Sequence, residues 1–296
     1  MFAYSGRLSE QSQGPFTSRT PASRRASTTA GDARSMNDQL TTMRRPRVVA
    51  HRGANDVAPE NTLAAVRAAV TIGVDAVEVD VQCTRDGVPV VLHDATLART
   101  TDIARRYPHR AHDPVSTFTY AEIRQLDAGS WRDDAFAGEP VPTLEQVLDA
   151  LRATGVGLLL EIKHPETQPR LVDAVADVLA CFSPGVAVTA QSFDAASLHA
   201  FGRLLPEVPR GLLVHHAPRQ PVLEAWVSAV NPWYGTVSSS YVRRAQLVGL
   251  ETYVWTANAR AAILRAADAG VEGIITDRPQ RALDLLRATR RKTSIR

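Results

Sequence analysis

Short apolar runs alternate with helix-like segments along most of this 296-residue chain, and this alternation limits the folds that it can adopt. After Arg47, strand-like runs are followed in turn by segments with the apolar periodicity of an amphipathic helix. Eight such repeats predict an α/β protein with a (β/α)8 TIM barrel, in preference to a doubly wound open sheet. The expected strands are 47–51, 75–81, 157–162, 186–190, 211–215, 235–238, 252–256 and 272–276, and the expected helices are 60–72, 143–154, 168–181, 194–204, 220–229, 240–248, 258–269 and 279–290.

Helix start and stop signals support these boundaries. Pro59 precedes the first expected helix, and Gly73 stands at its end. Asp194 and Asn258 are expected to be N-caps, because their short polar side chains accept hydrogen bonds from the first helical N–H groups. Pro279 suits the first turn of the last helix, where its missing N–H has no intrahelical partner.

One segment breaks the alternation with a hairpin signal. Asp-Gly at 86–87 lies between two apolar runs, and this dipeptide favours a tight hairpin turn. Because so short a loop cannot carry a parallel crossover, 88–93 is expected to pair antiparallel with 77–83. A turn centred on this dipeptide places His93 opposite Asp80.

A second segment, 95–142, is polar and aromatic and contains four prolines. It is too long for an ordinary loop and is expected to form a small insertion or lid after the second barrel strand. The chain then divides into a disordered N-terminal tail (1–45), the barrel (46–290) and a basic C-terminal tail (291–296).

The net charge of +3 conceals an uneven distribution. Arginines are concentrated in the two ends, so the body of the chain is mildly acidic, which argues against a nucleic-acid surface. The N-terminal tail has no continuous apolar segment of a secretory signal, and translation is expected to begin at Met36 or Met43. No apolar run reaches the roughly 18 residues of a membrane span. We therefore expect a cytoplasmic protein without stable membrane insertion, and no pattern predicts its oligomeric state.

Three carboxylates are expected at one end of the barrel. Glu78 and Asp80 are two residues apart on a strand and so share a face, and Glu161 ends another strand. Converging carboxylates without a thiolate favour one hard divalent cation, Mg²⁺ or Ca²⁺. Lys163 follows on the face of Glu161, where it could contact an anionic substrate group or pair with that carboxylate.

Two histidines arrive at the same end of the barrel. His51 ends the first strand and His93 ends the hairpin, and a pair of imidazoles can act as general acid and general base near neutral pH. Arg52 adds a planar donor suited to phosphate oxygens, and together with Lys163 and the divalent cation it would hold a phosphate. The chain lacks the Gly-rich phosphate loops of kinases and dinucleotide enzymes.

An ordered set of motifs over about 47–287 resembles the glycerophosphodiester phosphodiesterase family. Single motifs of this set are weak, but their order along the chain is specific. The motifs are His51-Arg52-Gly53, Pro59-Glu60-Asn61-Thr62, Glu78-Val79-Asp80, Thr84-Arg85-Asp86-Gly87, His93-Asp94, Glu161-Ile162-Lys163, Gln191-Ser192-Phe193, Trp255-Thr256-Ala257-Asn258 and Gly273-Ile274-Ile275-Thr276-Asp277-Arg278-Pro279.

The resemblance implies hydrolysis of a small-molecule glycerophosphodiester to sn-glycerol 3-phosphate and an alcohol. It implies that His51 and His93 form the acid–base pair. It also implies that one divalent cation is held by Glu78, Asp80 and Glu161.

The resemblance assigns the substrate contacts to residues around this pair. Arg52 and Lys163 would contact phosphate, Trp255 would form an apolar wall near the glycerol, and Gln191 would lie in the same pocket. It leaves open which histidine is the acid, which cation is preferred, and whether water or the neighbouring glycerol hydroxyl attacks.

Two alternatives keep the same fold. A lysophospholipase D or sphingomyelinase-D-like enzyme would need an apolar approach to the site, and the aromatic residues Trp131, Phe136, Trp233 and Tyr234 are candidates for it. A non-catalytic binding barrel is disfavoured by the intact histidine pair and the three acids.

Overall fold

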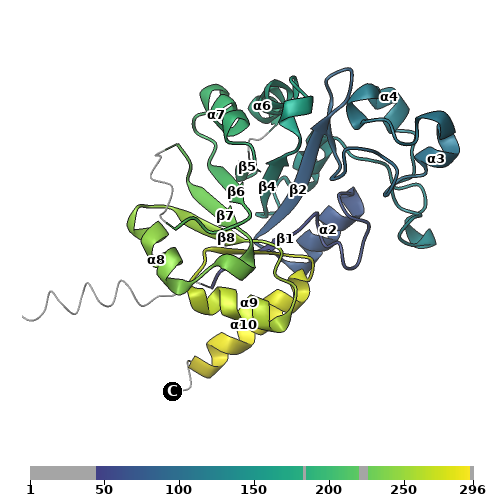
Figure 1. Ribbon diagram of the computed structural model, residues 1–296. Helices are drawn as coiled ribbons and strands as arrows, with labels where there is room; N and C mark the ends of the chain where they lie inside the picture. The colour runs from purple at the N-terminus through teal and green to yellow at the C-terminus, as the bar shows by residue number, and fades with distance from the viewer. Residues whose placement is uncertain (1–44, 183–184, 220–225, 294–296) are drawn as a thin grey trace, which may run out of the picture. The chain divides into compact units, whose positions relative to one another are not determined.

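The computed structural model describes residues 45–182, 185–219 and 226–293, which form a closed barrel of eight parallel strands with helices outside it (Figure 1). β1 pairs in parallel with both β9 and β2, and these two pairings close the barrel. This confirms the predicted TIM-barrel fold. The barrel strands are β1 (Arg47–Ala50), β2 (Ala76–Cys83), β4 (Gly157–Ile162), β5 (Val188–Ser192), β6 (Arg210–Val214), β7 (Ala229–Pro232), β8 (Glu251–Val254) and β9 (Gly273–Thr276).

Longer helices follow the strands and pack on the outside of the barrel. The predicted helix 220–229 falls partly outside the described residues. Its described part is wrong, because 226–228 form no helix and Ala229 opens β7. The longer helices of the described residues are α2 (Leu63–Ile72), α5 (Leu144–Leu151), α6 (Leu171–Phe182), α7 (Ala195–Leu204), α8 (Ser239–Leu247), α9 (Arg260–Ala269) and α10 (Pro279–Thr293).

Local capping explains where several helices begin and end. Asp194 caps α7 through a hydrogen bond from Ser197 N, as predicted, and Gly73 ends α2 with a φ of 79° in the left-handed region that glycine tolerates. The predicted N-cap at Asn258 is wrong, because Ala259 occupies that position in α9. The Asn258 side chain instead binds Asp277.

The predicted strand 235–238 is also wrong. The barrel strand at this place is β7, six residues earlier than the apolar pattern suggested, and it pairs with β6 through Val230 and Leu212. Residues 234–236 form a 3-10 turn instead. Ala229 and Val230 are almost fully buried in the barrel wall, whereas Trp233, just after the strand, is 41% exposed.

Two apolar layers stabilise the barrel. The larger lies between the strands and the surrounding helices, and includes Val77, Leu148 and Ile274. A smaller cluster fills the barrel interior, with Val49 and Leu159 among its members. Because the interior is packed with side chains, a substrate can reach the barrel only at its ends.

The predicted hairpin is present, with a register shifted by one residue. The strand β3 (Pro89–Val91) pairs antiparallel with β2, and Val91 lies opposite Val81. Leu92 N therefore donates to the carbonyl of Asp80, at 2.9 Å, and His93 lies one residue beyond the predicted position. The prediction that His93 faces Asp80 directly is wrong by this single step.

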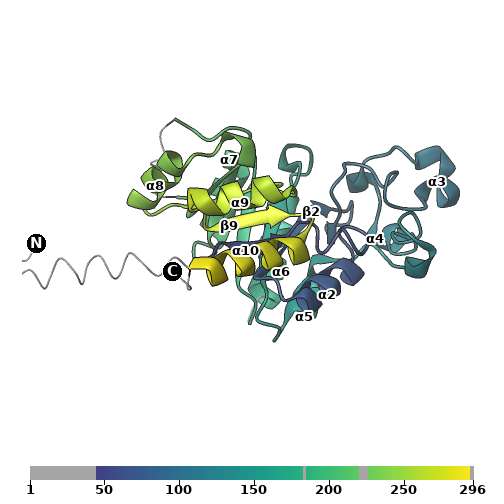
Figure 2. The same ribbon diagram turned by 90° about the horizontal axis from the view of Figure 1, so that it is seen from below.

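The segment after the hairpin forms a lobe beside β2, to the right in Figures 1 and 2, that contains α3 (Ile103–Arg106) and α4 (Tyr120–Ile123). It also contains the 3-10 turns Pro108–Arg110, Val115–Thr117 and Asp134–Phe136. The lobe has an apolar cluster of its own, in which Phe118 and Ile123 are completely buried.

The expected disordered tail falls on residues 1–44, which lie outside the described residues, whereas Arg45 is described and bonds to Asp75. The last helix extends to Thr293, beyond the expected boundary at 290. In the described parts of the chain, the helices are too short or too polar to cross a membrane.

Candidate active site

Three carboxylates from two neighbouring strands meet inside the carboxyl end of the barrel. Asp80 of β2 lies in register with Glu161 of β4, and Glu78 lies two residues earlier on β2. Oxygen atoms of the three side chains come within 4.8 Å of one another, and each residue is at most 8% exposed. Lys163 Nζ donates to Glu161 Oε1 at 2.8 Å and lies 3.4 Å from Asp80 Oδ1.

Burial of so much negative charge shifts the pKa values of the cluster apart. Burial and the neighbouring Asp80 raise the pKa of Glu161 to about 7. Burial, with Asp80 and Glu161 adding to it, raises the pKa of Glu78 well above its usual range. Burial acts in the same direction on Asp80, but Lys163 and Arg52 outweigh it and hold the pKa of that carboxyl below its usual value. The three buried carboxylates therefore raise one another's pKa, and the two cations beside them, Arg52 and Lys163, oppose this effect.

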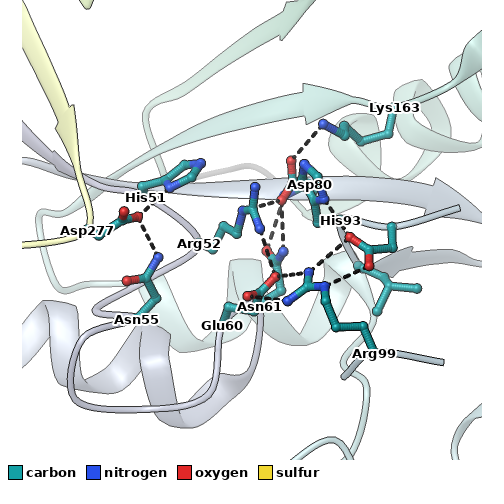
Figure 3. Close-up of polar contacts among 12 residues, drawn as sticks. His51, Arg52, Asn55, Glu60, Asn61, Asp80, His93, Arg99, Lys163 and Asp277 are labelled. Carbon is teal, nitrogen blue, oxygen red and sulfur yellow. Dashed lines mark hydrogen bonds and ion pairs between the residues drawn. The ribbon is translucent and has the colours of Figure 1, made fainter. Parts of the chain in front are cut away.

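Arg52 joins this cluster to the loop after β1 (Figure 3). Its backbone N–H donates to Glu78 at 2.8 Å, while its side chain contacts Glu60 at 2.8 Å and Asp80 at 3.3 Å. Asn61 donates to Asp80 Oδ2 at 2.8 Å and accepts from the Asp80 N–H at 3.2 Å. The loop therefore fixes the orientation of both the guanidinium and the Asp80 carboxylate.

Gly53 allows this loop to turn tightly. Its φ is 79°, and a Cβ at this position would lie 2.6 Å from the Cβ of Ala65 in α2. A glycine is required here by both the left-handed conformation and the close approach of the helix. The turn sets His51 and Arg52 at the end of β1.

His51 is held by a carboxylate that follows β9, the strand that pairs with β1. His51 Nδ1 lies 2.6 Å from Asp277 Oδ1, just after β9. Asn55 and Asn258 donate to the same carboxylate at 2.7 and 2.6 Å. Burial opposes ionisation of Asp277, but its hydrogen bonds, that of His51 foremost, hold its pKa well below the usual range. This arrangement leaves Nε2 of His51 as the ring nitrogen available for proton transfer.

His93 has a similar partner. Its Nδ1 lies 2.7 Å from Asp94 Oδ1, and Arg99 binds both oxygens of Asp94, at 2.7 and 2.9 Å. Arg99 also binds Glu60, so the two histidine loops are connected through charged side chains. Burial, foremost among the causes, lowers the pKa of His93, which favours the neutral ring.

The far half of the barrel mouth is aromatic. Phe193, after β5, stacks on His215, after β6, with ring centroids 4.9 Å apart. Trp255, after β8, meets both rings edge-on at 5.5 and 5.9 Å. Gln191 lies below them, in register with Glu161, and is 1% exposed. The predicted substrate residues Gln191 and Trp255 therefore come from the half of the barrel formed by β5 to β8, whereas His51 follows β1 in the other half.

A pocket of about 380 Å³ opens beside His51 and Arg52. Its other wall comes from the insertion, where Trp131 is 39% exposed and Arg132 donates to the backbone carbonyls of Asn55 and Asp56. The insertion therefore contributes directly to the surroundings of the site.

Sequence reasoning gave no role to Asp277, Asp94 or Arg99. Asp277 follows a predicted strand and belongs to a recognised motif, and this position at a strand end was a usable signal. Arg99 gives no comparable signal, since its contacts with Asp94 and Glu60 depend on the path of the insertion.

Known proteins are similar to this chain over most of its length. The model of the glycerophosphoryl diester phosphodiesterase family matches residues 51–281. A glycerophosphodiester phosphodiesterase of Caldanaerobacter subterraneus is 33% identical over 248 residues, covering 81% of this chain and 97% of the relative. A glycerophosphodiester phosphodiesterase of Bacillus subtilis is 31% identical over 252 residues, covering 78% of this chain and 83% of the relative.

Solved structures show the same likeness. A phosphodiesterase from Oleispira antarctica, in complex with the product sn-glycerol-3-phosphate, matches with a TM-score of 0.74 and 29% identity, covering 82% of this chain and 97% of that one. A glycerophosphodiester phosphodiesterase from Agrobacterium tumefaciens matches with a TM-score of 0.67 and 31% identity, covering 82% of this chain and 99% of that one.

Proposed function

This chain belongs to the glycerophosphoryl diester phosphodiesterase family, and on that premise we propose that it hydrolyses glycerophosphodiesters to sn-glycerol 3-phosphate and an alcohol by acid–base catalysis between His51 and His93. The observation that carries the proposal is the pair of histidines, each with Nδ1 held by a carboxylate. A ring fixed in this way presents Nε2 in one tautomer and one orientation. We propose a cytoplasmic location for this activity.

One divalent cation, Mg²⁺ or Ca²⁺, is proposed to bind to Glu78, Asp80 and Glu161. Asp80 Oδ1 is buried and accepts no hydrogen bond from the described residues, and the donor set consists of oxygen atoms alone, which suits a hard cation. The raised pKa values of Glu78 and Glu161 agree with carboxylates that lack a sufficient counter-charge. When bound, the cation would supply Lewis-acid stabilisation of charge on the phosphate.

The remaining steps are assigned to side chains. Arg52 and Lys163 lie beside the carboxylates and are proposed to contact the phosphate, because their pKa values are raised and they stay cationic. In both residues, burial opposes the charged form and the surrounding acids outweigh it. One histidine removes the proton of the nucleophile, either water or the neighbouring glycerol hydroxyl, and the other protonates the departing alcohol. If the hydroxyl attacks, a cyclic phosphate forms, and water then opens it in a second step to give glycerol 3-phosphate.

The glycerol end is proposed to lie against Trp255, with Gln191 donating from the same side of the barrel. Both come from the half of the barrel formed by β5 to β8, which does not contain β1, so a substrate spanning the mouth would place its phosphate between this half and the histidines. The bound product of the Oleispira antarctica relative, sn-glycerol-3-phosphate, supports this substrate class.

The direct test is release of glycerol 3-phosphate from a panel of glycerophosphodiesters, with and without added Mg²⁺ and Ca²⁺. The His51→Ala and His93→Ala variants should each lose about 10²–10⁴-fold in turnover. Near wild-type turnover in either variant would remove that histidine from the mechanism.

A lipid phosphodiesterase of the lysophospholipase D or sphingomyelinase-D type is the second candidate. It is favoured by the exposed aromatic residues at the mouth, where Phe193 is 42% and Trp233 is 41% exposed. Rates on glycerophosphocholine and lysophosphatidylcholine distinguish the two candidates. A strong preference for the lipid would overturn the first proposal.

A further inference from the structure

A hydrogen bond inside the barrel joins β5 to β7 across the intervening strand. Asn231 Nδ2 donates to Gln191 Oε1 at 2.9 Å, and the two residues are 0% and 1% exposed. The strand between them, β6, has Gly211 in register with Gln191. A Cβ at Gly211 would lie 2.7 Å from Asn231 Nδ2, so the glycine provides the space in which the two amides meet.

This bond decides which end of the Gln191 amide faces the site. Because the amide oxygen of Gln191 is engaged by Asn231, the NH₂ group points the other way. Among the described residues this NH₂ group has no protein acceptor. Gln191 is in register with Glu161, so its N–H donors lie at the level of the carboxylate cluster. At this position an NH₂ group is more favourable than an amide oxygen, because it can donate hydrogen bonds to the carboxylates and to an anionic phosphate.

Asn231 also fixes the aromatic wall. Its backbone carbonyl accepts a hydrogen bond from the indole N–H of Trp255 at 2.7 Å. Its own side-chain oxygen is buried and has no partner in the described part of the chain. A buried, unpaired oxygen is unfavourable for folding, so a purely structural role does not explain an asparagine at this position.

We propose that Asn231 is a positioning residue, which holds the Gln191 amide with its NH₂ group toward the bound glycerophosphodiester. The proposal rests on the proposed function, and it adds a determinant of substrate binding that contacts no substrate itself. It predicts that the effect of changing Asn231 depends on the presence of Gln191.

The test uses the nearly isosteric variant Asn231→Asp in the full chain, with glycerophosphocholine as substrate. The new carboxylate accepts but does not donate, so Gln191 must turn its NH₂ group away from the site and present its oxygen to the phosphate. We expect KM to rise by about 10–100-fold with kcat changed less than about threefold, as for a lost hydrogen bond to a charged group.

A double-mutant cycle separates this role from a general loss of structure. In a Gln191→Ala background, Asn231→Asp should change KM by less than about threefold, because no amide is left to orient. Equal effects of Asn231→Asp in both backgrounds would overturn the proposal. If the buried acid prevents folding, Asn231→Ala replaces it in the same cycle, with a smaller expected rise in KM that again disappears without Gln191.

The wild-type measurement separates this proposal from the proposed function. No release of glycerol 3-phosphate by the wild-type protein from any glycerophosphodiester would overturn both. An active wild type together with an unchanged KM in the folded Asn231 variants would overturn the positioning role alone.

Discussion

The Asp277→Asn variant is expected to keep the fold and lose most of the activity. Asp277 Oδ1 accepts from His51 and Asn55, while Oδ2 accepts from Asn258. An amide has one acceptor oxygen and one NH₂ group, so in either orientation its NH₂ group faces a donor that the carboxylate had bound. The negative charge that stabilises a protonated His51 is lost in both orientations.

The size of the effect follows from this geometry. Loss of the negative charge in both orientations, and misorientation of His51 where the NH₂ group faces it, remove most of its acid–base contribution, and we expect kcat to fall by about 10²–10³-fold, or about 2.7–4.1 kcal/mol. Each unpaired donor, one or two according to the amide orientation, should cost about 1–3 kcal/mol of stability, which is a fall of several degrees in Tm. Glycerol 3-phosphate release and thermal melting measure the two effects separately.

Asp75→Asn is the matched control. Asp75 also accepts three hydrogen bonds, from Arg45 at 2.5 and 2.9 Å and from Val48 N at 2.7 Å, but it lies before β2, at the opposite end of the barrel. This control should lose stability and keep kcat/KM within about threefold, as expected for a site far from the chemistry. Activity of Asp277→Asn within threefold of the wild type would refute the argued role of the carboxylate.

Three further outcomes are expected. Exhaustive chelation should lower turnover by at least about 100-fold, with recovery on adding Mg²⁺ or Ca²⁺ but not in Asp80→Asn, and full activity in chelator would remove the metal from the mechanism. Phe118→Ala should destabilise the protein by about 3–5 kcal/mol in chemical denaturation, whereas Leu247→Ala, at an 85% exposed site, should change stability by less than about 0.5 kcal/mol. Because the pKa of Asp277 is lowered in the folded state, its ionised form stabilises the fold above its unfolded pKa of about 3.9, and this contribution declines as pH falls further. The Tm difference between wild type and Asp277→Asn should therefore be constant above about pH 5 and shrink toward acid pH, and a difference that grows instead would contradict this linkage.

The sequence predicted strands best where a long run of consecutive residues is buried. Runs such as Val77–Val81 have strong apolar patterns, and the strands that they predict are present in the barrel. β7 was misplaced because it has four residues, two of which are Asn231 and Pro232, and neither favours a strand. The register of the hairpin was missed by one residue because it depends on the turn geometry rather than on composition.

The site residues that could be predicted from the sequence are those at or near the ends of strands. His51, Glu78 and Glu161 could be grouped because parallel strands deliver their carboxyl ends to one face of a barrel. The carboxylate that orients His51 is 226 residues away in the sequence. Its position at a strand end marks Asp277 as a candidate, but its pairing with His51 depends on how the barrel closes.

The two ends of the insertion lie side by side in the structure. Val91 N donates to the carbonyl of Pro142 at 2.9 Å, Val90 forms a bridge with Thr143, and β2 and β4 pair directly along their length. The barrel wall is therefore continuous beneath the inserted lobe. Evolution or an engineer could exchange the whole lobe, and with it one wall of the pocket, as a graft that leaves the eight strands uninterrupted.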